Sequence, residues 1–396
     1  MKRLRLELSS VIKGRYEIDV EDINKSCFAI NRSFIINTIL CDNKIVNYKV
    51  IEIRYNYKII SFDLLDESHK VIIEYEGIID GSTGRYPYVK EKTTDDFYLL
   101  RGETVFYPTF EIPESEEYLA KMLYPTTNEK FQIIIKMNSK YMLCTNLDKI
   151  NQFTYEGYNP TFAVGKFKRY SGYFGEIYHM NLAENSIMKI DSIIKSTNEY
   201  MNRFKNEKIK DFKVIVIPHG YGSFVLSNTM FITIDGVSEY EQLIHELIHT
   251  NWNPLCDVTV QKSRFFDEAI TQYFTARVCN ALAIKSQEDI MTNYKNQYLK
   301  MIKDNGYEPH PIQEYHIYDC GDLAYTFGAL ALNAIENKIG TNNMDKIMSK
   351  MLDKYKREKI NFAKFKALFD EDIDDIYNDY FLTNNASNML SLLIWH

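Results

Sequence analysis

Two histidines one helical turn apart carry the strongest chemical signal in the sequence. The segment 238–250 reads SEYEQLIHELIHT, in which His245 and His249 are four residues apart. On a helix this spacing places both imidazoles on one face, where they can bind a single Zn²⁺. Glu246 lies one step round the same helix, so its carboxylate can hydrogen-bond a water on the metal without being a ligand itself. The pattern is HExxH, a known arrangement for zinc chemistry.

A catalytic zinc site needs a third protein ligand and an open fourth position. The segment 264–278, RFFDEAITQYFTARV, has a second helical pattern, and Glu268 lies in its first turns with 18 residues between it and His249. A helix packed against the first one would direct this carboxylate at the metal. We therefore expect His245, His249 and Glu268 to bind one Zn²⁺ per chain, with Glu246 as the general base.

These residues resemble the signature of the membrane alanyl aminopeptidase family of gluzincin zinc metallopeptidases, which is HExxH, then 18 residues, then Glu. That family usually has a tryptophan shortly after the second histidine, as Trp252 is here, and an aromatic or leucine pair with Asn or Asp before the third ligand, as in 265–267 (FFD). Its downstream segment Tyr-x-Lys-Gly-Ala is matched by 325–329 (YTFGA), except that Phe327 replaces the lysine. The resemblance implies a zinc metallopeptidase in which Tyr325 hydrogen-bonds the oxyanion formed from a peptide substrate.

One segment of that family is missing. Exopeptidases of the family have Gly-x-Met-Glu-Asn upstream of HExxH, and its glutamate binds the amino group of the substrate. The corresponding segment 218–224 reads PHGYGSF and has no glutamate. A desolvated ammonium without a carboxylate partner is costly, so strict aminopeptidase specificity does not follow from the resemblance.

Three functions therefore stay open. The expected one is an aminopeptidase-like enzyme that acts on small peptides and uses another group to bind the amine. The second is an endopeptidase, which does not require a free N-terminus. The third is a zinc-binding scaffold protein without turnover, which the presence of Glu246 and Tyr325 beside the ligands argues against.

The first half of the chain predicts strands. Short runs rich in Val, Ile, Tyr and Phe, separated by turn residues, are typical of an antiparallel β domain. The runs cover residues 4–8, 34–39, 45–55, 70–75 and 131–137.

The pattern then changes to a helical period, with two further strands. Helices are predicted at 185–203 and from 238 onward, where Ser238 and Glu241 suggest a capping box, and strands at 212–217 and 231–234. We expect an α+β fold with two domains. Residues 1–180 would form the antiparallel β-rich domain, and residues 181–396 a thermolysin-like, mostly helical catalytic domain with a small mixed sheet.

Composition and charge argue against several classes of partner. The net charge is −7 over 396 residues, so no basic field is expected to bind nucleic acid. No stretch of about 18 apolar residues predicts a membrane span. The six cysteines are scattered without a CxxC pair, and no apolar run of signal-peptide length begins the chain, so a cytoplasmic location with reduced thiols is expected. A peptide is the one predicted partner, and the oligomeric state is open.

Overall fold

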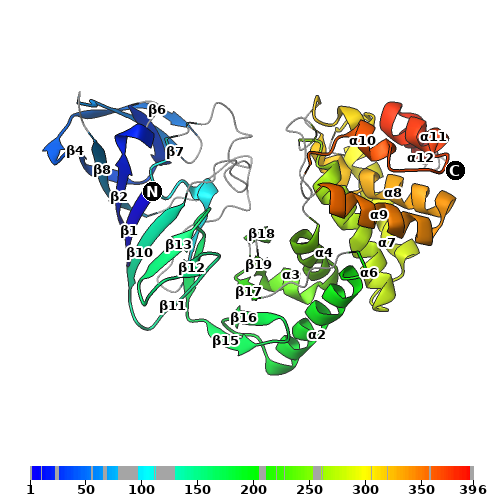
Figure 1. Ribbon diagram of the computed structural model, residues 1–396, viewed down its shortest axis with the longest axis horizontal. Helices are drawn as coiled ribbons and strands as arrows, with labels where there is room; N and C mark the ends of the chain where they lie inside the picture. The colour runs from blue at the N-terminus through cyan, green and yellow to red at the C-terminus, as the bar shows by residue number, and fades with distance from the viewer. Residues whose placement is uncertain are drawn as a thin grey trace. The chain divides into compact units, whose positions relative to one another are not determined.

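Strands fill the first part of the chain and helices the second, as the colours of Figure 1 show. The computed structural model describes residues 2–9, 11–22, 26–54, 57–65, 69–78, 97–110, 112, 130–204, 211–219, 221–226, 228–252, 260, 262–304, 306–318, 320–355 and 358–392. Two compact units are formed. The first comprises Met1–Ser171, Gly175–Leu182 and Lys213–Ile234, and the second comprises Gly172–Phe174, Ala183–Phe212 and Asp235–His396.

The predicted combination of a β-rich N-terminal region and a helical C-terminal region is confirmed. The boundary near residue 180 stays a prediction.

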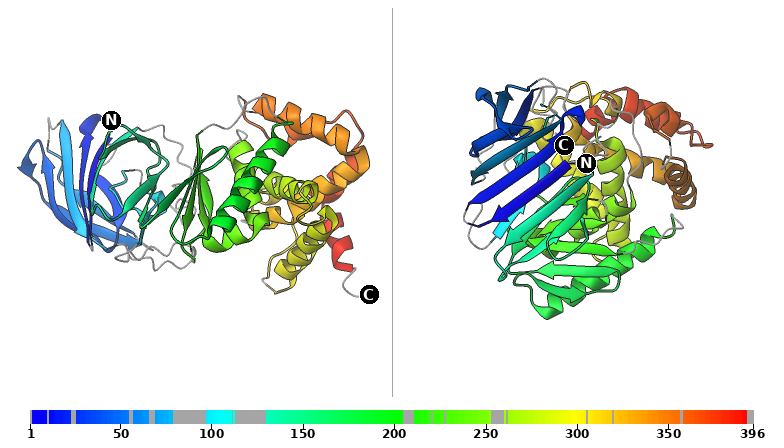
Figure 2. Two further views of the ribbon diagram at one scale, coloured as in Figure 1. Left: turned by 90° about the horizontal axis from the view of Figure 1, so that it is seen from below. Right: turned by 60° about the vertical axis from the view of Figure 1, so that its left-hand side comes forward.

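The first unit is built on an eight-stranded sheet whose strands run side by side in Figure 2. Its order is β12 (Asp148–Lys149), β13 (Thr154–Gly157), β10 (Phe131–Met137), β1 (Lys2–Leu8), β2 (Ile12–Asp19), β8 (Lys70–Gly77), β4 (Ile35–Cys41) and β5 (Lys44–Ile45). Residues along β2 alternate between buried and outward-facing, because successive side chains of a strand point to opposite faces. The buried face joins the main apolar core of this unit.

The prediction of a wholly antiparallel β domain is wrong at one pair of strands. β1 and β10 are parallel, with Leu4 opposite Ile133 and Leu6 opposite Ile135. A parallel pair needs a long crossover connection, and the more than 120 residues between these strands provide it.

The other strands that the structure describes form three smaller sheets. They are β11 (Met142–Thr145), β14 (Phe162–Gly165) and β9 (Phe97–Leu100); β3 (Cys27–Asn31), β7 (Tyr57–Phe62) and β6 (Tyr48–Arg54); and β15 (Lys168–Ser171), β16 (Gly175–His179), β17 (Phe212–Ile217), β19 (Thr229–Thr233) and β18 (Phe224–Leu226). The last sheet is mixed, since β17 is parallel and β18 antiparallel to β19. Its strands belong to the first unit and not to the helical one, where the sequence predicts the mixed sheet. The strand predicted at 231–234 ends one residue earlier, because Ile234 begins a helix.

Helices make up the second unit. The α-helices among the described residues are α2 (Glu184–Met201), α3 (Ile234–Ser238), α4 (Tyr240–Asn251), α6 (Ile270–Ala281), α7 (Gln287–Asp304), α8 (Phe327–Ile339), α9 (Thr341–Tyr355), α10 (Phe362–Lys366), α11 (Asp374–Tyr377) and α12 (Asn385–Leu392). Shorter turns are η1 (Val20–Asp22), η2 (Gly102–Thr104), η3 (Phe265–Ala269), η4 (Ile312–Glu314), η5 (Gly321–Tyr325) and η6 (Asn378–Leu382). Of the described helices, none is long and apolar enough to span a membrane.

Helix α4 carries the HExxH segment and packs against α2 and α6. Its side chains Leu243, Ile244, Leu247 and Ile248 are fully buried, which fixes the rotation of the helix and directs the two histidine positions to another face. The predicted capping box is wrong. Ser238 is the last residue of α3, and the residue that caps α4 is Glu239, whose side chain makes no capping hydrogen bond.

A glycine brings α8 close to the turn that carries Glu268. A Cβ atom built on Gly328 would lie 2.5 Å from the Cβ of Ala269 and 3.3 Å from the ring of Phe265. Both neighbours belong to the π-helical turn η3, and both are fully buried. The absence of a side chain at Gly328 therefore sets the spacing between α8 and η3.

We expect the substitution Gly328→Ala to destabilise the protein by about 1–3 kcal/mol, because overpacking outweighs the gain in helix propensity of about 1 kcal/mol. The free energy of unfolding in urea measures it. The control is Asn337→Ala on the exposed side of the same helix, for which a change within about 0.5 kcal/mol is expected. Increased stability of Gly328→Ala would contradict the close approach.

Candidate metal centre

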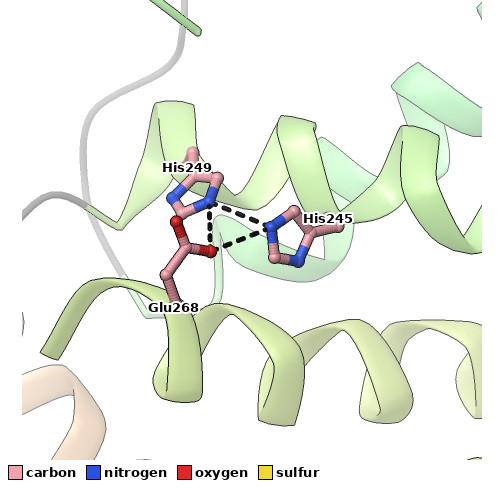
Figure 3. Close-up of side chains that lie close together, drawn as sticks. All are labelled: His245, His249 and Glu268. Atoms are coloured by element: carbon pink, nitrogen blue, oxygen red, sulfur yellow. Dashed lines mark hydrogen bonds and ion pairs between the residues drawn. The ribbon is translucent and has the colours of Figure 1, made fainter. Parts of the chain in front are cut away.

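Three side chains from two facing helical segments converge on one point (Figure 3). The Nε2 atoms of His245 and His249 are 3.1 Å apart, and each lies 3.2 Å from Oε2 of Glu268. The side chains are 12%, 18% and 5% exposed, respectively. The three ligands predicted from the spacing are therefore brought together, with their donor atoms almost equally spaced.

The triangle of donor atoms has the size that a zinc ion requires. Ligand atoms about 2.0–2.1 Å from a tetrahedral metal lie about 3.3 Å from one another. The observed separations of 3.1 and 3.2 Å are close to this value. Two imidazole nitrogens and one carboxylate oxygen are also the ligand types of catalytic zinc sites with an open fourth position. The residues present therefore fit a Zn²⁺ ion.

A buried tryptophan fixes the end of α4 against η3. Trp252 follows directly after α4, is fully buried, and donates a 2.8 Å hydrogen bond from its indole Nε1 to the carbonyl oxygen of Phe266. Its ring packs on Phe274 of α6, with ring centroids 5.6 Å apart. Because Phe266 is two residues before Glu268, this bond ties the helix of the histidines to the turn of the glutamate.

A threonine holds the far side of the second histidine. The hydroxyl Oγ1 of Thr271 lies 3.3 Å from Nδ1 of His249, and Thr271 is fully buried on α6. When the Nε2 lone pair of His249 faces a metal, Nδ1 carries the proton and donates it to this hydroxyl. Such a bond selects the tautomer and the ring orientation that a metal needs.

An arginine holds the other oxygen of the glutamate. The guanidinium of Arg264 donates from Nη2 to Oε1 of Glu268, and its Nε lies 3.0 Å from Oδ2 of Asp267. Burial alone raises the pKa of Glu268, but the positive charges of His249 and Arg264 and hydrogen bonds from both histidines outweigh this and hold the pKa well below its usual value. Glu268 is therefore an anion at neutral pH, as a metal ligand must be.

Tyr325 lies beside these residues. It is the last residue of η5, and its ring stacks on that of His245 at a centroid distance of 6.3 Å and an interplanar angle of 20°. Burial and the negative charge of Glu268 raise the pKa of Tyr325 well above its usual value, against an opposing effect of Arg264. The phenol therefore keeps its proton at neutral pH and can donate a hydrogen bond.

Glu246, the predicted general base, directly follows His245 on α4 and is 7% exposed. All five site residues predicted from sequence thus belong to the second unit. Arg264 and Thr271 were not predicted. The one signal for each is spacing on a helix, since Arg264 is four residues before Glu268 and Thr271 is three residues after it. The segment 218–224, which lacks the amine-binding glutamate, runs from the end of β17 to the first residue of β18, and its Gly220 is outside the described residues.

Solved structures define the class of fold, although no protein-family profile and no curated protein matches the chain. The aminopeptidase N family protein from Idiomarina loihiensis is similar with a TM-score of 0.69 and 11% identity, over 96% of this chain and 76% of that chain. Yeast LTA4 hydrolase has a TM-score of 0.62 and 11% identity, over 96% of this chain and 67% of that chain.

A third similar structure is a variant of the M1 zinc metallopeptidase from Deinococcus radiodurans bound to a Tyr-Ser-Ala substrate. Its TM-score is 0.58 and its identity 11%, over 99% of this chain and 92% of that chain. The chain therefore has the fold of the M1 zinc metallopeptidases.

Removing the hydroxyl of Thr271 tests the geometry of the centre. We expect Thr271→Val to weaken Zn²⁺ binding by about 10-fold, because Nδ1 of His249 loses its acceptor in a buried place. Competition with a chromogenic chelator measures the affinity. Thr275→Val is the matched control, since Thr275 is equally buried one turn further along α6 and hydrogen-bonds the carbonyl oxygen of Thr271. Equal affinities in the two variants would contradict a role of Thr271 in orienting His249.

Proposed function

We propose that this chain is a zinc-dependent metallopeptidase that hydrolyses peptide bonds with activated water, with an aminopeptidase-like preference for small peptides. The observation that carries the proposal is the convergence of His245, His249 and Glu268 at 3.1–3.2 Å, next to Glu246 on the same helix. The likeness of the fold to M1 zinc metallopeptidases supports it. A thermolysin-like arrangement of the catalytic unit and a cytoplasmic location are parts of the proposal.

The proposed ligands are His245, His249 and Glu268, which would hold one Zn²⁺ per chain. When bound, the ion supplies Lewis-acid chemistry, because it polarises a carbonyl group and makes water acidic enough to attack at neutral pH. Glu246 accepts the proton of the attacking water and passes it to the nitrogen of the leaving amine. Its burial keeps bulk water from competing for that proton.

Tyr325 acts on the negative charge that develops on the substrate. Its neutral phenol donates a hydrogen bond to the carbonyl oxygen of the substrate, and this bond strengthens as the oxygen becomes negative. The stacked ring of His245 limits the movement of the phenol, so the donor is already oriented before the substrate arrives. A preorganised donor needs no reorientation during the reaction, which is why it favours the transition state over the bound substrate.

The second candidate function is an endopeptidase. The missing glutamate in 218–224 favours it, because an enzyme that does not bind a free amine has no need for that carboxylate. The Tyr-Ser-Ala substrate bound in the Deinococcus radiodurans structure is a short peptide, which supports a preference for small peptides instead. A zinc-binding scaffold without turnover is the third candidate.

Substitution of the general base separates metal binding from catalysis. We expect Glu246→Gln to bind zinc as the unchanged protein does and to lose kcat by about 10²–10⁴-fold, because the amide cannot accept the proton. Zinc content and steady-state kinetics on a fluorogenic peptide measure the two properties. Glu239→Gln at the exposed cap of the same helix is the control and should keep its kcat within about twofold. Full activity of Glu246→Gln would contradict the assigned role.

A pair of peptides distinguishes the candidate functions. The two fluorogenic peptides are identical except that one is acetylated at its N-terminus, and each is tested with and without a zinc chelator. We expect cleavage of the free peptide alone, abolished by the chelator, because an aminopeptidase binds the free amine. Cleavage of both peptides would establish the endopeptidase, and cleavage of neither would favour the scaffold. Hydrolysis that survives complete removal of zinc would contradict all three.

A further inference from the structure

Arg264 contacts three side chains at or beside the proposed metal ligands. Its guanidinium contacts Oε1 of Glu268, Oδ2 of Asp267 and, at 3.4 Å, the hydroxyl oxygen of Tyr325. Its charge also lies 5.9 Å from the centre of the Tyr325 ring. One side chain therefore links the third proposed ligand with the proposed oxyanion donor, which lie on separate elements, η3 and η5.

The backbone around Arg264 is shaped for this contact. Arg264 precedes η3 in the left-handed conformation, with φ of +57°, which costs a side-chain-bearing residue free energy. A Cβ atom on Gly321, the first residue of η5, would lie 2.9 Å from Cγ of Arg264 and 2.8 Å from the carbonyl oxygen of Lys262. Arg264 thus has an unfavourable backbone conformation, and the absence of a side chain at Gly321 leaves room for the aliphatic part of Arg264.

The two oxygens of the Glu268 carboxylate face different partners. Oε2 faces both histidine nitrogens at 3.2 Å, whereas Oε1 faces the guanidinium (Figure 3 shows the first of these groups). A carboxylate anchored through one oxygen can offer only the other to a metal. The anchor therefore favours ligation through one oxygen and leaves coordination space for water and substrate.

The contact with Tyr325 settles the direction of the phenol proton. A guanidinium can only donate hydrogen bonds, so the Tyr325 oxygen accepts from Arg264. The phenol proton is then directed to another acceptor, which in this structure is the carboxylate of Glu268. An O–H group that accepts a bond from a cation is also the stronger donor. This is the polarity required of a group that stabilises an oxyanion.

We propose that Arg264 is a positioning residue that sets Glu268 and Tyr325 relative to one another, so that one bound cation and one oxyanion donor face the same substrate carbonyl. The proposal rests on the proposed peptidase function for its kinetic part and on the ligand set alone for its metal part. Asp267 completes the array, because its contact with Nε fixes the plane of the guanidinium.

Metal binding tests the first half of the proposal without any turnover. Arg264→Gln keeps the Cβ atom and the backbone strain but loses the charge, and we expect Zn²⁺ affinity to fall by about 10–100-fold. The visible absorption of the Co²⁺-substituted protein should change in shape, since Glu268 can now rotate and bind through both oxygens. Arg264→Lys should recover most of the affinity, because an ammonium can still pair with Oε1.

Kinetics test the second half. An ammonium cannot hold Glu268, Asp267 and Tyr325 together, so Arg264→Lys should lower kcat by about 10–100-fold and leave KM within about twofold. In a Tyr325→Phe background the same substitution should change kcat by no more than about twofold, because Arg264 acts through the phenol. Additive effects of the two substitutions would overturn the link to Tyr325.

Controls separate this role from a general effect on folding. Arg203→Gln changes an exposed arginine of the same unit, whose guanidinium lies over the ring of Tyr200, and should alter neither zinc affinity nor kinetics. Thermal unfolding of the zinc-free variants reports stability. A lower melting temperature of Arg264→Gln with unchanged Zn²⁺ affinity and unchanged Co²⁺ absorption would overturn the proposal. If the unchanged protein hydrolyses no peptide, the proposed function fails, while the metal measurements still decide the part played by Arg264.

Discussion

The close approach of the Nε2 atoms of His245 and His249 to Oε2 of Glu268 is the constraint that the packing of the second unit must satisfy. Each of these atoms carries a lone pair, and at 3.1–3.2 Å such atoms repel one another unless positive charge lies among them. A divalent cation removes this repulsion, and protons on the imidazoles do so less completely. The packing of α4 on α6 must hold the three donors together before a metal binds, so the centre is preorganised at the expense of local stability.

Rigid contacts around the ligands provide that preorganisation. Trp252 joins the end of α4 to the carbonyl oxygen of Phe266, and Gly328 lets α8 press on η3 from another side. The turn η3 itself is π-helical, an arrangement that often occurs at functional sites because it widens one turn of a helix. Glu268 is therefore held by the packing around its own turn of backbone, in addition to the contacts of its carboxylate with Arg264 and the two histidines.

The elements and the ligands could be predicted from sequence because their signals are local. Short runs of apolar residues predict β10 and β17 with their observed bounds, and the four-residue spacing of His245 and His249 needs no knowledge of the fold. The parallel pairing of β1 with β10 could not be predicted, because residue patterns within a strand do not record its direction relative to a distant partner.

Arg264 and Thr271 were missed for a similar reason. Arginine and threonine are common on helices. The packing of α6 on α4 brings Thr271 next to His249, and the packing of η3 on η5 brings Arg264 next to Tyr325. The capping box failed because α3 and α4 are separate helices, so the expected cap residue ends one helix and does not begin the next.

The lysine of the family segment is replaced here by Phe327, and the packing explains how the chain accommodates the change. Phe327 is 1% exposed and stacks on Tyr298, with ring centroids 4.5 Å apart, while the hydroxyl of Tyr298 hydrogen-bonds Ser387 at 2.6 Å. A buried lysine at this place would need a charged partner. Two apolar rings need none, so the start of α8 is fixed by packing.

The balance of charge at the centre bears on which substrates it can select. Glu268 is paired with Arg264, and a bound Zn²⁺ would add two positive charges to this pair. An ammonium group placed near them therefore meets no excess of negative charge, and its desolvation is not compensated. A developing oxyanion, by contrast, meets the metal and the phenol of Tyr325 directly. In the proposed function these groups would therefore favour the transition state of amide hydrolysis, and any selection for a free N-terminus would have to come from a carboxylate outside this group.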